Sequence, residues 1–495
     1  MAASPVTGDL AARRFKVMLG LFLAILAGAL FVYRHEGALS DPDSWWHIKS
    51  GFDILSSGHF PVTDSYSHSF FGKPWIAKEW LSQIILALAY AAGGWNGVTL
   101  LAALAIAAAL FATYYYLASE LRPQLAAVIA VVAIFLSSTT FVARPHLLTI
   151  VLAVVWTAGL FRAADKLKPP HFGFLALIAL WANLHGSFTL GLAIAGFAML
   201  HVFEQVRLNN MSLMIKWGAF IVLSPLVTLI HPYTYEPFMI SLELARGNEA
   251  VQFISEWQPF NAKDDRILEA ALLVALLAMM MLRLRLTWSK AAFALFTLHM
   301  FLVHARFGYV FFLLVPIAVA TEIARQYPAV SIAVWRTQSR DWLERFAAER
   351  FVPAASVLSA AALIAAGLFA VLFPVMPPQK SAPVDAIAYV KSRGISGNVL
   401  NSYNFGGVLI FHDIKTFIDG RAEQLFLGGF VTDVVKTQQL GGEALFEQQL
   451  QIYHIDWTLL EPADRRIGLL DKMPGWQRAY ADEFAVVHVR KLPGS

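Results

Sequence analysis

The fold of this chain is decided by residues 17–47, which begin with the apolar run VMLGLFLAILAGALFVY (17–33) and end with the acidic segment DPDSWWH (41–47). The run is long enough to cross a bilayer as a helix. Arg13, Arg14 and Lys16 precede the run, and no small-residue cleavage site follows it, which predicts a retained membrane helix instead of a signal peptide. The acidic segment is therefore expected where the first helix leaves the membrane.

Composition extends this interpretation to the whole chain. Of its 495 residues, 58% are hydrophobic and only 15% are charged, which excludes an ordinary soluble globule and predicts a polytopic membrane protein. The net charge of +4 comes from lysines and arginines that flank apolar runs, so it indicates topology and predicts no nucleic-acid partner. The chain has no cysteine, which excludes disulfides and leaves any metal to histidine and carboxylate ligands.

Eleven apolar runs are predicted to cross the membrane, and one shorter run is not. The stretch 80–92 is apolar but stops at Gly93-Gly94, and its placement sets the orientation of everything that follows. If it lies on the surface and the N-terminus is cytoplasmic, 17 of the 26 lysines and arginines before residue 380 are cytoplasmic, against 8 of 26 if it crosses. The positive-inside rule favours the surface helix. The predicted spans are 17–34, 96–117, 125–141, 147–161, 172–184, 188–203, 214–230, 267–282, 291–303, 307–324 and 352–375.

This orientation places the first loop, residues 35–95, on the outer side as a folded cap. A short helix is predicted over 45–57 and ends at Gly58, a typical helix stop. Turn residues follow at 61–65 and 72–74. The helix at 45–57 and the surface helix at 80–92, if both lie on the membrane, would cover a cavity.

The composition becomes that of a soluble protein after the proline-rich segment 374–378. We therefore predict a transmembrane domain over 1–378 and a small outer α/β domain over 379–495. In the second domain, helices are expected at 383–393, 431–438, 443–452 and 465–472, and strands at 397–401, 415–419, 456–460 and 485–490. The predicted fold class is a polytopic α-helical membrane protein with about eleven transmembrane helices, interfacial helices in the first outer loop and this C-terminal α/β domain.

Ionisable residues gather at the predicted outer helix ends. Such residues are costly at membrane depth and usually face a cavity or a partner, so their convergence predicts an outward-facing polar pocket. The outer turns carry Arg144, His146, His185, His231, His304 and Arg306, and the same side holds Asp41, Asp43, His47, Asp64 and Glu79.

Several of these residues also have a structural interpretation. Asp41, followed by a proline, suits a helix N-cap, and Asp43 would then lie in the first turn, where the helix dipole favours a negative charge. Asp64 lies among turn residues and suits an Asx turn. Glu79 is either a solvated residue or a second catalytic acid. A single histidine or arginine at such a depth can be an interfacial anchor.

A carboxylate beside cations at lipid depth suits group transfer from a phosphorylated lipid. In that chemistry Asp43 removes the proton of the acceptor hydroxyl, and arginines and histidines stabilise charge on the leaving phosphate. No cofactor is certain, although the Asp41-x-Asp43 pair could bind a divalent cation such as Mg²⁺ or Mn²⁺. The sequence contains no His-Glu-x-x-His motif, glycine-rich phosphate loop or Gly-x-Ser-x-Gly motif.

Residues 15–120 resemble the first outer loop of the GT-C-fold glycosyltransferases. The resemblance rests on a basic N-terminus, a span, Pro-Asp-x-x-x-His (42–47), a helix ending in Ser-Gly (57–58), Asp-x-Tyr-Ser (64–67) and Glu-Trp-Leu (79–81). It is nearest to bacterial transferases of the aminoarabinose-to-lipid-A and protein-mannosyltransferase type. It implies a polyprenyl-phosphate sugar donor and an essential acid after the first span, here Asp43.

Two departures from that family concern the second acid and the donor phosphate. The family often has Glu-Lys-Pro where this chain has Gly-Lys-Pro (72–74), with its acid displaced to Glu79. The aminoarabinose enzymes also carry a carboxylate where this chain has Arg-Pro-His (144–146). The C-terminal segments 401–407 and 417–421 resemble the tails of similar bacterial membrane proteins and predict either a binding edge or a strand-ending turn.

The predicted function is therefore a glycosyltransferase of the bacterial inner membrane, with its active site and C-terminal domain in the periplasm. Its expected partners are a polyprenyl-phosphate-linked sugar, membrane lipids and a lipid, glycan or protein acceptor. One alternative is an oligosaccharide ligase or polymerase that uses a lipid-diphosphate donor. Another is a non-catalytic subunit for polysaccharide or lipid transport, which predicts mid-span ionisable residues and inverted repeats that the sequence does not show.

Overall fold

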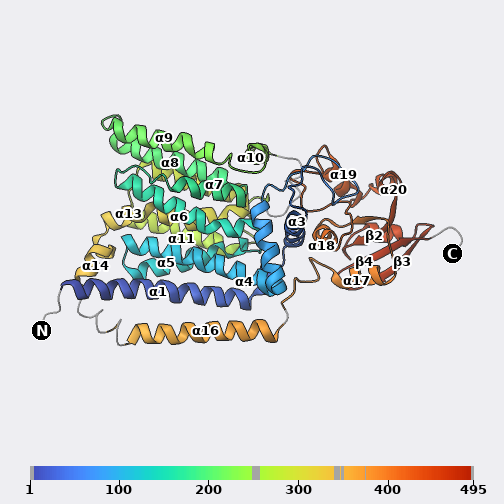
Figure 1. The fold of residues 1–495 in the computed structure, drawn as a ribbon, viewed down its shortest axis with the longest axis horizontal. Coiled ribbons are helices and arrows are strands. Elements are labelled where there is room, and N and C mark those ends of the chain that lie inside the picture. Colours follow the sequence, from blue (N-terminus) through green and yellow to red (C-terminus); the bar gives the residue numbers. More distant parts are fainter. Residues whose placement is uncertain (1–4, 248–256, 339–345, 347–349, 374, 492–495) are drawn as a thin grey trace.

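The structure is a computed structural model that describes residues 5–491 except 248–256, 339–345, 347–349 and 374 (Figure 1). Each of the eleven predicted spans overlaps a helix, so the polytopic helical fold class is confirmed. Among the described residues, seven helices are long and apolar enough to cross a membrane, while α7, α9 and α12 are apolar but shorter. The bundle comprises α1 (Pro5–Tyr33), α4 (Trp80–Glu120), α5 (Pro123–Ser137), α6 (Pro145–Asp165), α7 (Phe174–Leu184), α8 (Phe188–Val206), α9 (Met211–Val227), α11 (Arg266–Leu282), α12 (Trp288–Val303), α13 (Gly308–Gln326) and α16 (Val352–Leu372).

The apolar stretch 80–92 is a separate helical segment at the start of α4. The helix is broken at Gly93 (φ −157°, ψ 21°) and Gly94 (φ 57°, ψ −142°), and the second of these conformations is accessible only to glycine. The segment before the break runs across the ends of the bundle helices, and the segment after it enters the bundle (Figure 1). This arrangement agrees with the prediction that 80–92 is a surface helix and not a span.

Helix α3 (Asp43–Ser57) lies between the bundle and the C-terminal part of the chain (Figure 1). It ends as predicted at Gly58, whose left-handed conformation (φ 69°) directs its N–H to the carbonyl of Ile54 at 2.9 Å. Its Gly51 packs directly on α4, because a side chain there would meet the carbonyl oxygen of Gln83 at 2.1 Å. The shorter helices beside it and elsewhere are α2 (His35–Ala38), α10 (Glu236–Arg246) and α14 (Ile332–Gln338).

The C-terminal region, residues 375–491, contains a four-stranded mixed sheet in the order β1-β2-β4-β3. Strand β1 pairs parallel with β2, and β4 pairs antiparallel with both β2 and β3. The elements are α17 (Val384–Ser392), β1 (Asn398–Asn401), α18 (Gly406–Phe411), α19 (Phe430–Thr437), α20 (Glu443–Ile452), β2 (Ile455–Leu460), α21 (Arg466–Leu470), β3 (Trp476–Ala481) and β4 (Val486–Arg490).

The strand predicted at 415–419 is wrong, and β3 was not predicted. Residues 416–419 are buried, but the backbone of this segment bonds to the first outer loop and to the side chain of Asn401 in β1 and does not form a strand of the sheet. The N–H of Thr416 donates to the carbonyl of Tyr66 at 3.0 Å, and the N–H of Phe417 donates to the Asn401 side chain at 2.9 Å. Strand β3 alternates little in burial, with only Trp476 buried, so it lacks the pattern of a half-buried strand.

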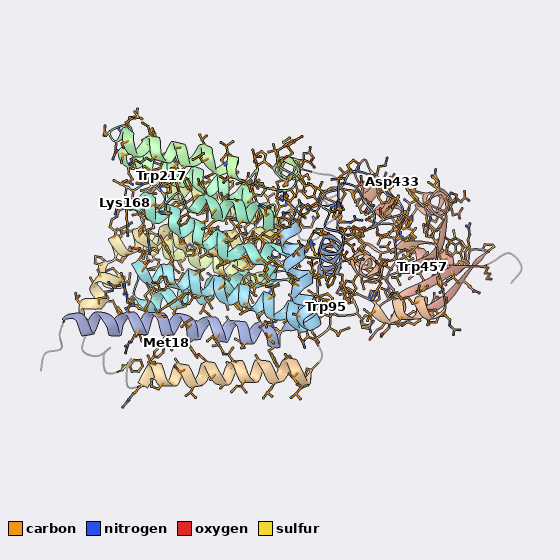
Figure 2. The ribbon with its side chains drawn as sticks, in the orientation of Figure 1. Met18, Trp95, Lys168, Trp217, Asp433 and Trp457 are labelled. Atoms are coloured by element: carbon orange, nitrogen blue, oxygen red, sulfur yellow. The ribbon has the colours of Figure 1, made fainter. Side chains whose placement is uncertain are left out.

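The first outer loop and the C-terminal region pack together as one cap over the end of the bundle. Their side chains share a hydrophobic cluster in which Trp46 and Trp75 from the loop meet Ile410 and Phe417 from the C-terminal region. A second contact joins the cap to the bundle, where the ring centroids of Trp45 and Trp95 are 4.5 Å apart. Figure 2 shows side chains filling the region between bundle and cap, where Trp95 is labelled.

Candidate active site

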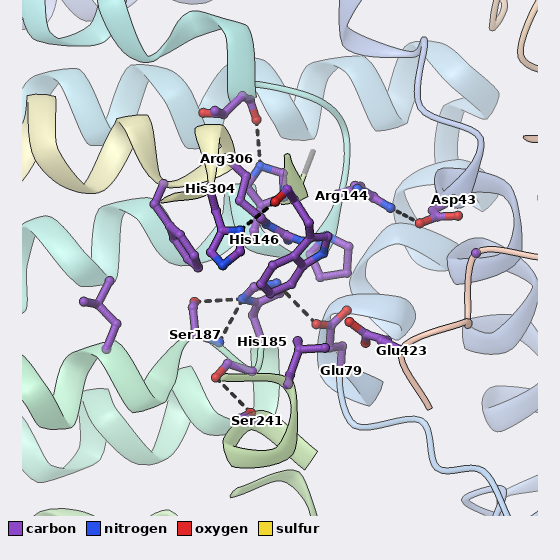
Figure 3. Close-up of a pocket in the computed structure, with 18 of the residues that line it drawn as sticks. Asp43, Glu79, Arg144, His146, His185, Ser187, Ser241, His304, Arg306 and Glu423 are labelled. Carbon is purple, nitrogen blue, oxygen red and sulfur yellow. Dashed lines mark hydrogen bonds and ion pairs between the residues drawn. The ribbon is translucent and has the colours of Figure 1, made fainter. Parts of the chain in front are cut away.

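A cavity of about 780 Å³ lies where the cap meets the bundle (Figure 3). It is lined by the first outer loop, by turns between bundle helices and by the C-terminal region. Two residues of the predicted site, Asp64 and His231, lie outside this lining. The cavity brings together the other nine, namely Asp41, Asp43, His47, Glu79, Arg144, His146, His185, His304 and Arg306.

Asp41 and Asp43 form one ionic group with Arg144. Asp41 acts as the predicted cap, because its side chain accepts a hydrogen bond from the N–H of Asp43 at 2.8 Å and Pro42 after it has helical angles. Arg144 precedes the first residue of α6, and its Nε lies 3.1 Å from Asp41 Oδ1 while its Nη2 is paired with Asp43 Oδ2. The guanidinium therefore fixes the direction of both carboxylates.

The other oxygen of Asp43 faces the C-terminal region at Gly420. A side chain at position 420 would place its Cβ 1.7 Å from Asp43 Oδ1. Any residue other than glycine would therefore displace the Asp43 carboxylate. Gly407 of α18 packs in the same way against the carbonyl oxygen of Pro42. The C-terminal region is thus in direct contact with the residues at the start of α3, and it forms one wall of the cavity.

Glu79 is a buried carboxylate between two histidines. Its Oε1 lies 3.3 Å from His185 Nε2 (Figure 3). Its Oε2 lies 3.8 Å from His47 Nε2. Burial raises the pKa of Glu79 to about 7, and the nearby Glu423 adds to this shift. Burial and neighbouring positive groups lower the pKa of His47 and His185 well below the usual value, so both imidazoles are neutral at pH 7.

Lys78 and Glu423 join the first outer loop to the C-terminal region across the cavity. Lys78 Nζ is paired with Glu423 Oε1. Burial alone would raise the pKa of Glu423, but the Lys78 ammonium together with Arg306 and Arg144 outweighs it, so the pKa is lowered. His231 supports this arrangement from outside the lining, since its Nε2–H donates to the carbonyl of Lys78 at 3.1 Å.

The remaining predicted residues line the side of the cavity formed by the bundle. The imidazole of His304 donates from Nδ1 to the carbonyl of Trp257 at 2.6 Å, and the guanidinium of Arg306 lies 4.5 Å above the ring of the same tryptophan. His146 donates from Nε2 to the carbonyl of Thr140 at 2.7 Å. These contacts hold the side chains at the cavity wall.

Asp64, predicted either as a site residue or as part of an Asx turn, forms the turn. It accepts a hydrogen bond from the N–H of Tyr66 at 2.9 Å, as in an Asx turn, and it is only 1% exposed. It also receives Arg421 Nη1 at 2.5 Å, while Asp419 binds the same guanidinium at two points, each 2.8 Å long. Burial would lower the pKa of Arg421, but the two carboxylates raise it.

The Asp41-x-Asp43 pair does not fit a divalent cation in this arrangement. Arg144 bonds to both carboxylates and supplies the positive charge that a metal ion would bring. Within the described part of the chain, no group of three or more histidine and carboxylate side chains is placed to hold a metal. We therefore derive no step through a metal ion.

Sequence reasoning missed Lys78, Gly420 and Glu423. Lys78 is adjacent to the predicted acid Glu79, and a charged dipeptide before an apolar run was an available signal. Gly420 lies within the FIDGR segment (417–421), which was predicted to be either a binding edge or a strand-ending turn, with no role for the glycine itself. Glu423 carried no signal, because it meets Lys78 across 345 positions of sequence.

The bundle, its surface helix and its cap have the fold of the GT-C glycosyltransferases. The chain is similar in structure to the apo oligosaccharyltransferase of Archaeoglobus fulgidus, with a TM-score of 0.52 and 11% identity over 88% of this chain and 69% of that one. ArnT of Cupriavidus metallidurans bound to undecaprenyl phosphate matches at a TM-score of 0.49, with 12% identity, over 94% of this chain and 97% of that one. ArnT in the apo state matches at the same TM-score, with 13% identity, over 93% of this chain and 95% of that one. No known family and no curated protein matches the sequence.

Proposed function

We propose that this chain is a glycosyltransferase that moves a sugar from a polyprenyl-phosphate donor to an acceptor hydroxyl on a lipid, glycan or protein. The observation that carries the proposal is the cavity, in which carboxylates and cations from distant segments meet at one end of a membrane bundle. The GT-C fold supports it by analogy, since fold alone does not define function. We place the chain in a bacterial inner membrane, as its resemblance to bacterial transferases implies, and the distribution of lysine and arginine favours the cavity on the periplasmic side.

In the proposed reaction the acceptor oxygen attacks the anomeric carbon of the sugar, and the bond from that carbon to the phosphate oxygen breaks. Asp43 accepts the acceptor proton, and the phosphate leaves with the bonding electrons. Arg144 and Gly420 hold the Asp43 carboxylate in one direction. Lys78 and Arg306 are cations that line the cavity and can stabilise charge on the leaving phosphate.

Glu79 is proposed to act in its protonated form. With a pKa near 7, it is half protonated in the empty cavity at neutral pH, and a bound phosphate would favour the neutral form further because like charges repel. A protonated Glu79 can donate a hydrogen bond to the phosphate, whereas an ionised one would repel it. The two acids thus have different roles, with Asp43 as the base and Glu79 as a donor.

This assignment predicts a pH dependence. Between pH 6 and 8 the protonated fraction of Glu79 falls about tenfold, so kcat/KM for the donor should fall as pH rises through about 7. Glu79→Gln keeps a neutral donor at every pH and should retain transfer while losing this fall. The measurement is kcat/KM across pH for both proteins. If the glutamine variant were inactive at all pH values, Glu79 would be a base or a charged ligand instead.

The function itself is tested by donor choice. The purified chain in proteoliposomes should transfer labelled sugar from a polyprenyl-phosphate donor and release polyprenyl phosphate. It should not use a nucleotide sugar, which lacks the lipid chain that would hold it at a membrane cavity. Transfer only from a nucleotide sugar would overturn the proposal.

The same assay separates the alternatives. An oligosaccharide ligase is the second candidate, because the fold resembles an oligosaccharyltransferase. It predicts transfer from a polyprenyl-diphosphate glycan instead, and loss of transfer with a chelator would favour it further. A transport subunit predicts that no donor is consumed although polyprenyl lipids bind.

A further inference from the structure

A second recess lies at the opposite end of the bundle from the active-site cavity. Figure 1 places the start of α1 and helix α14 at one end of the molecule and the C-terminal region at the other. Between α1, α4 and α14 is a recess of about 100 Å³. Its lining is strongly basic and aromatic, and it comprises Arg13, Lys16, Val17, Tyr115, Ile332, Trp335 and Arg336.

Lys16 is a buried ammonium that, among the described residues, has no anionic partner in the recess. It is 8% exposed, and its Nζ lies 4.3 Å above the ring of Tyr115. Within the described part of the chain, no hydrogen bond or ion pair involves the side chains of Lys16, Arg13 or Arg336. The carboxylate that attracts Lys16 electrostatically, that of Glu120, is itself paired with Arg162 at 3.3 Å.

Packing holds the recess open. Phe15 and Trp335 join α1 to α14, with their ring centroids 6.1 Å apart, and both side chains are buried. The spacing of Arg13 and Lys16 places them on one face of α1, directed at the same recess. Three cations are thus gathered around a small space by apolar contacts that do not depend on a ligand.

We propose that this recess binds the phosphate group of an anionic phospholipid. Cations gathered in this way repel one another, and an anion between them would relieve both this repulsion and the cost of burying Lys16. The recess lies at the first turns of a membrane helix, at the depth of lipid headgroups, and basic pockets between membrane helices are suited to such headgroups. Its volume is that of a single small group, which suits one phosphate.

The test is lipid binding by the full chain, purified in detergent and titrated with phosphatidylglycerol, phosphatidylcholine or inorganic phosphate, with native mass spectrometry as the readout. Phosphatidylglycerol should bind most tightly. Lys16→Gln and Arg336→Gln should each weaken its binding about fivefold, because a cation at such a surface contributes about that factor. Arg14→Gln is the matched control, since it removes the same charge from the same helix but from outside the recess.

Each possible result decides the proposal. Arg336 is exposed, so its variant should fold even if the Lys16 variant does not. Equal weakening by Arg14→Gln would show general surface attraction and overturn the site. Equal binding of the two lipids would overturn it as well. If inorganic phosphate saturated the recess and phosphatidylglycerol added nothing, the ligand would be free phosphate and the lipid assignment would be wrong.

Discussion

Asp43→Asn is expected to lower sugar transfer by about 10² to 10⁴-fold, the range that a positioned general base contributes. The substitution replaces one carboxylate oxygen by an amide nitrogen of similar size, so it removes the proton acceptor and the negative charge that pairs with Arg144 but leaves the side-chain shape nearly unchanged. Arg144 keeps its second partner, since its Nε also contacts Asp41 at 3.1 Å. The helix α3 and its contact with Gly420 should persist.

The matched control is Asp53→Asn on the same helix. Asp53 lies outside the cavity lining and pairs with Lys49 at 2.8 Å. This variant should therefore retain near-normal transfer. Both variants are compared for transfer from the polyprenyl-phosphate donor and for thermal unfolding. Near-normal transfer by the Asp43→Asn enzyme, or an equal loss in the control, would remove Asp43 from the role of base.

The parts of the fold that follow from local chemistry could be predicted from sequence. Gly94 at the helix break and Gly58 at the helix stop each have a positive φ, a backbone conformation that the residue type already indicates. The placement of 80–92 also followed, because charge counting depends only on the order of residues. These features need no knowledge of distant contacts.

Contacts between the first outer loop and the C-terminal region could not be predicted in the same way. Lys78 and Glu423 are far apart in sequence, and nothing in the sequence around either residue indicates that it pairs with the other. The segment 415–419 suggests a strand, because Phe417 and Ile418 lie at its centre, but its backbone partners are Tyr66 of the first outer loop and the side chain of Asn401. Asp64 shows the same limit of sequence-based prediction. Its structural role follows from its ion pair with Arg421, which is distant in sequence.

Arg421→Met is expected to destabilise the cap by about 3–5 kcal/mol, the cost of breaking a buried ion pair from one side. Arg421 is 1% exposed and lies between Asp64 of the first outer loop and Asp419 of the C-terminal region, with the rings of Tyr66 and Trp75 about 5 Å from its guanidinium. Removing it leaves two buried carboxylates without a counter-charge. The midpoint of thermal unfolding in detergent, followed by tryptophan fluorescence, should fall clearly.

The control and a rescue identify the cause. Arg478→Met removes an exposed guanidinium paired with Asp471, and such pairs contribute about 0–1 kcal/mol, so its unfolding should be nearly unchanged. Adding Asp64→Asn and Asp419→Asn to the Arg421→Met variant removes the stranded charges and should recover part of the lost stability. If the rescue failed while the control behaved as expected, the loss would come from packing against the two aromatic rings. Because Gly420 is the neighbour of Arg421 and touches Asp43, a loosened cap should also lower sugar transfer.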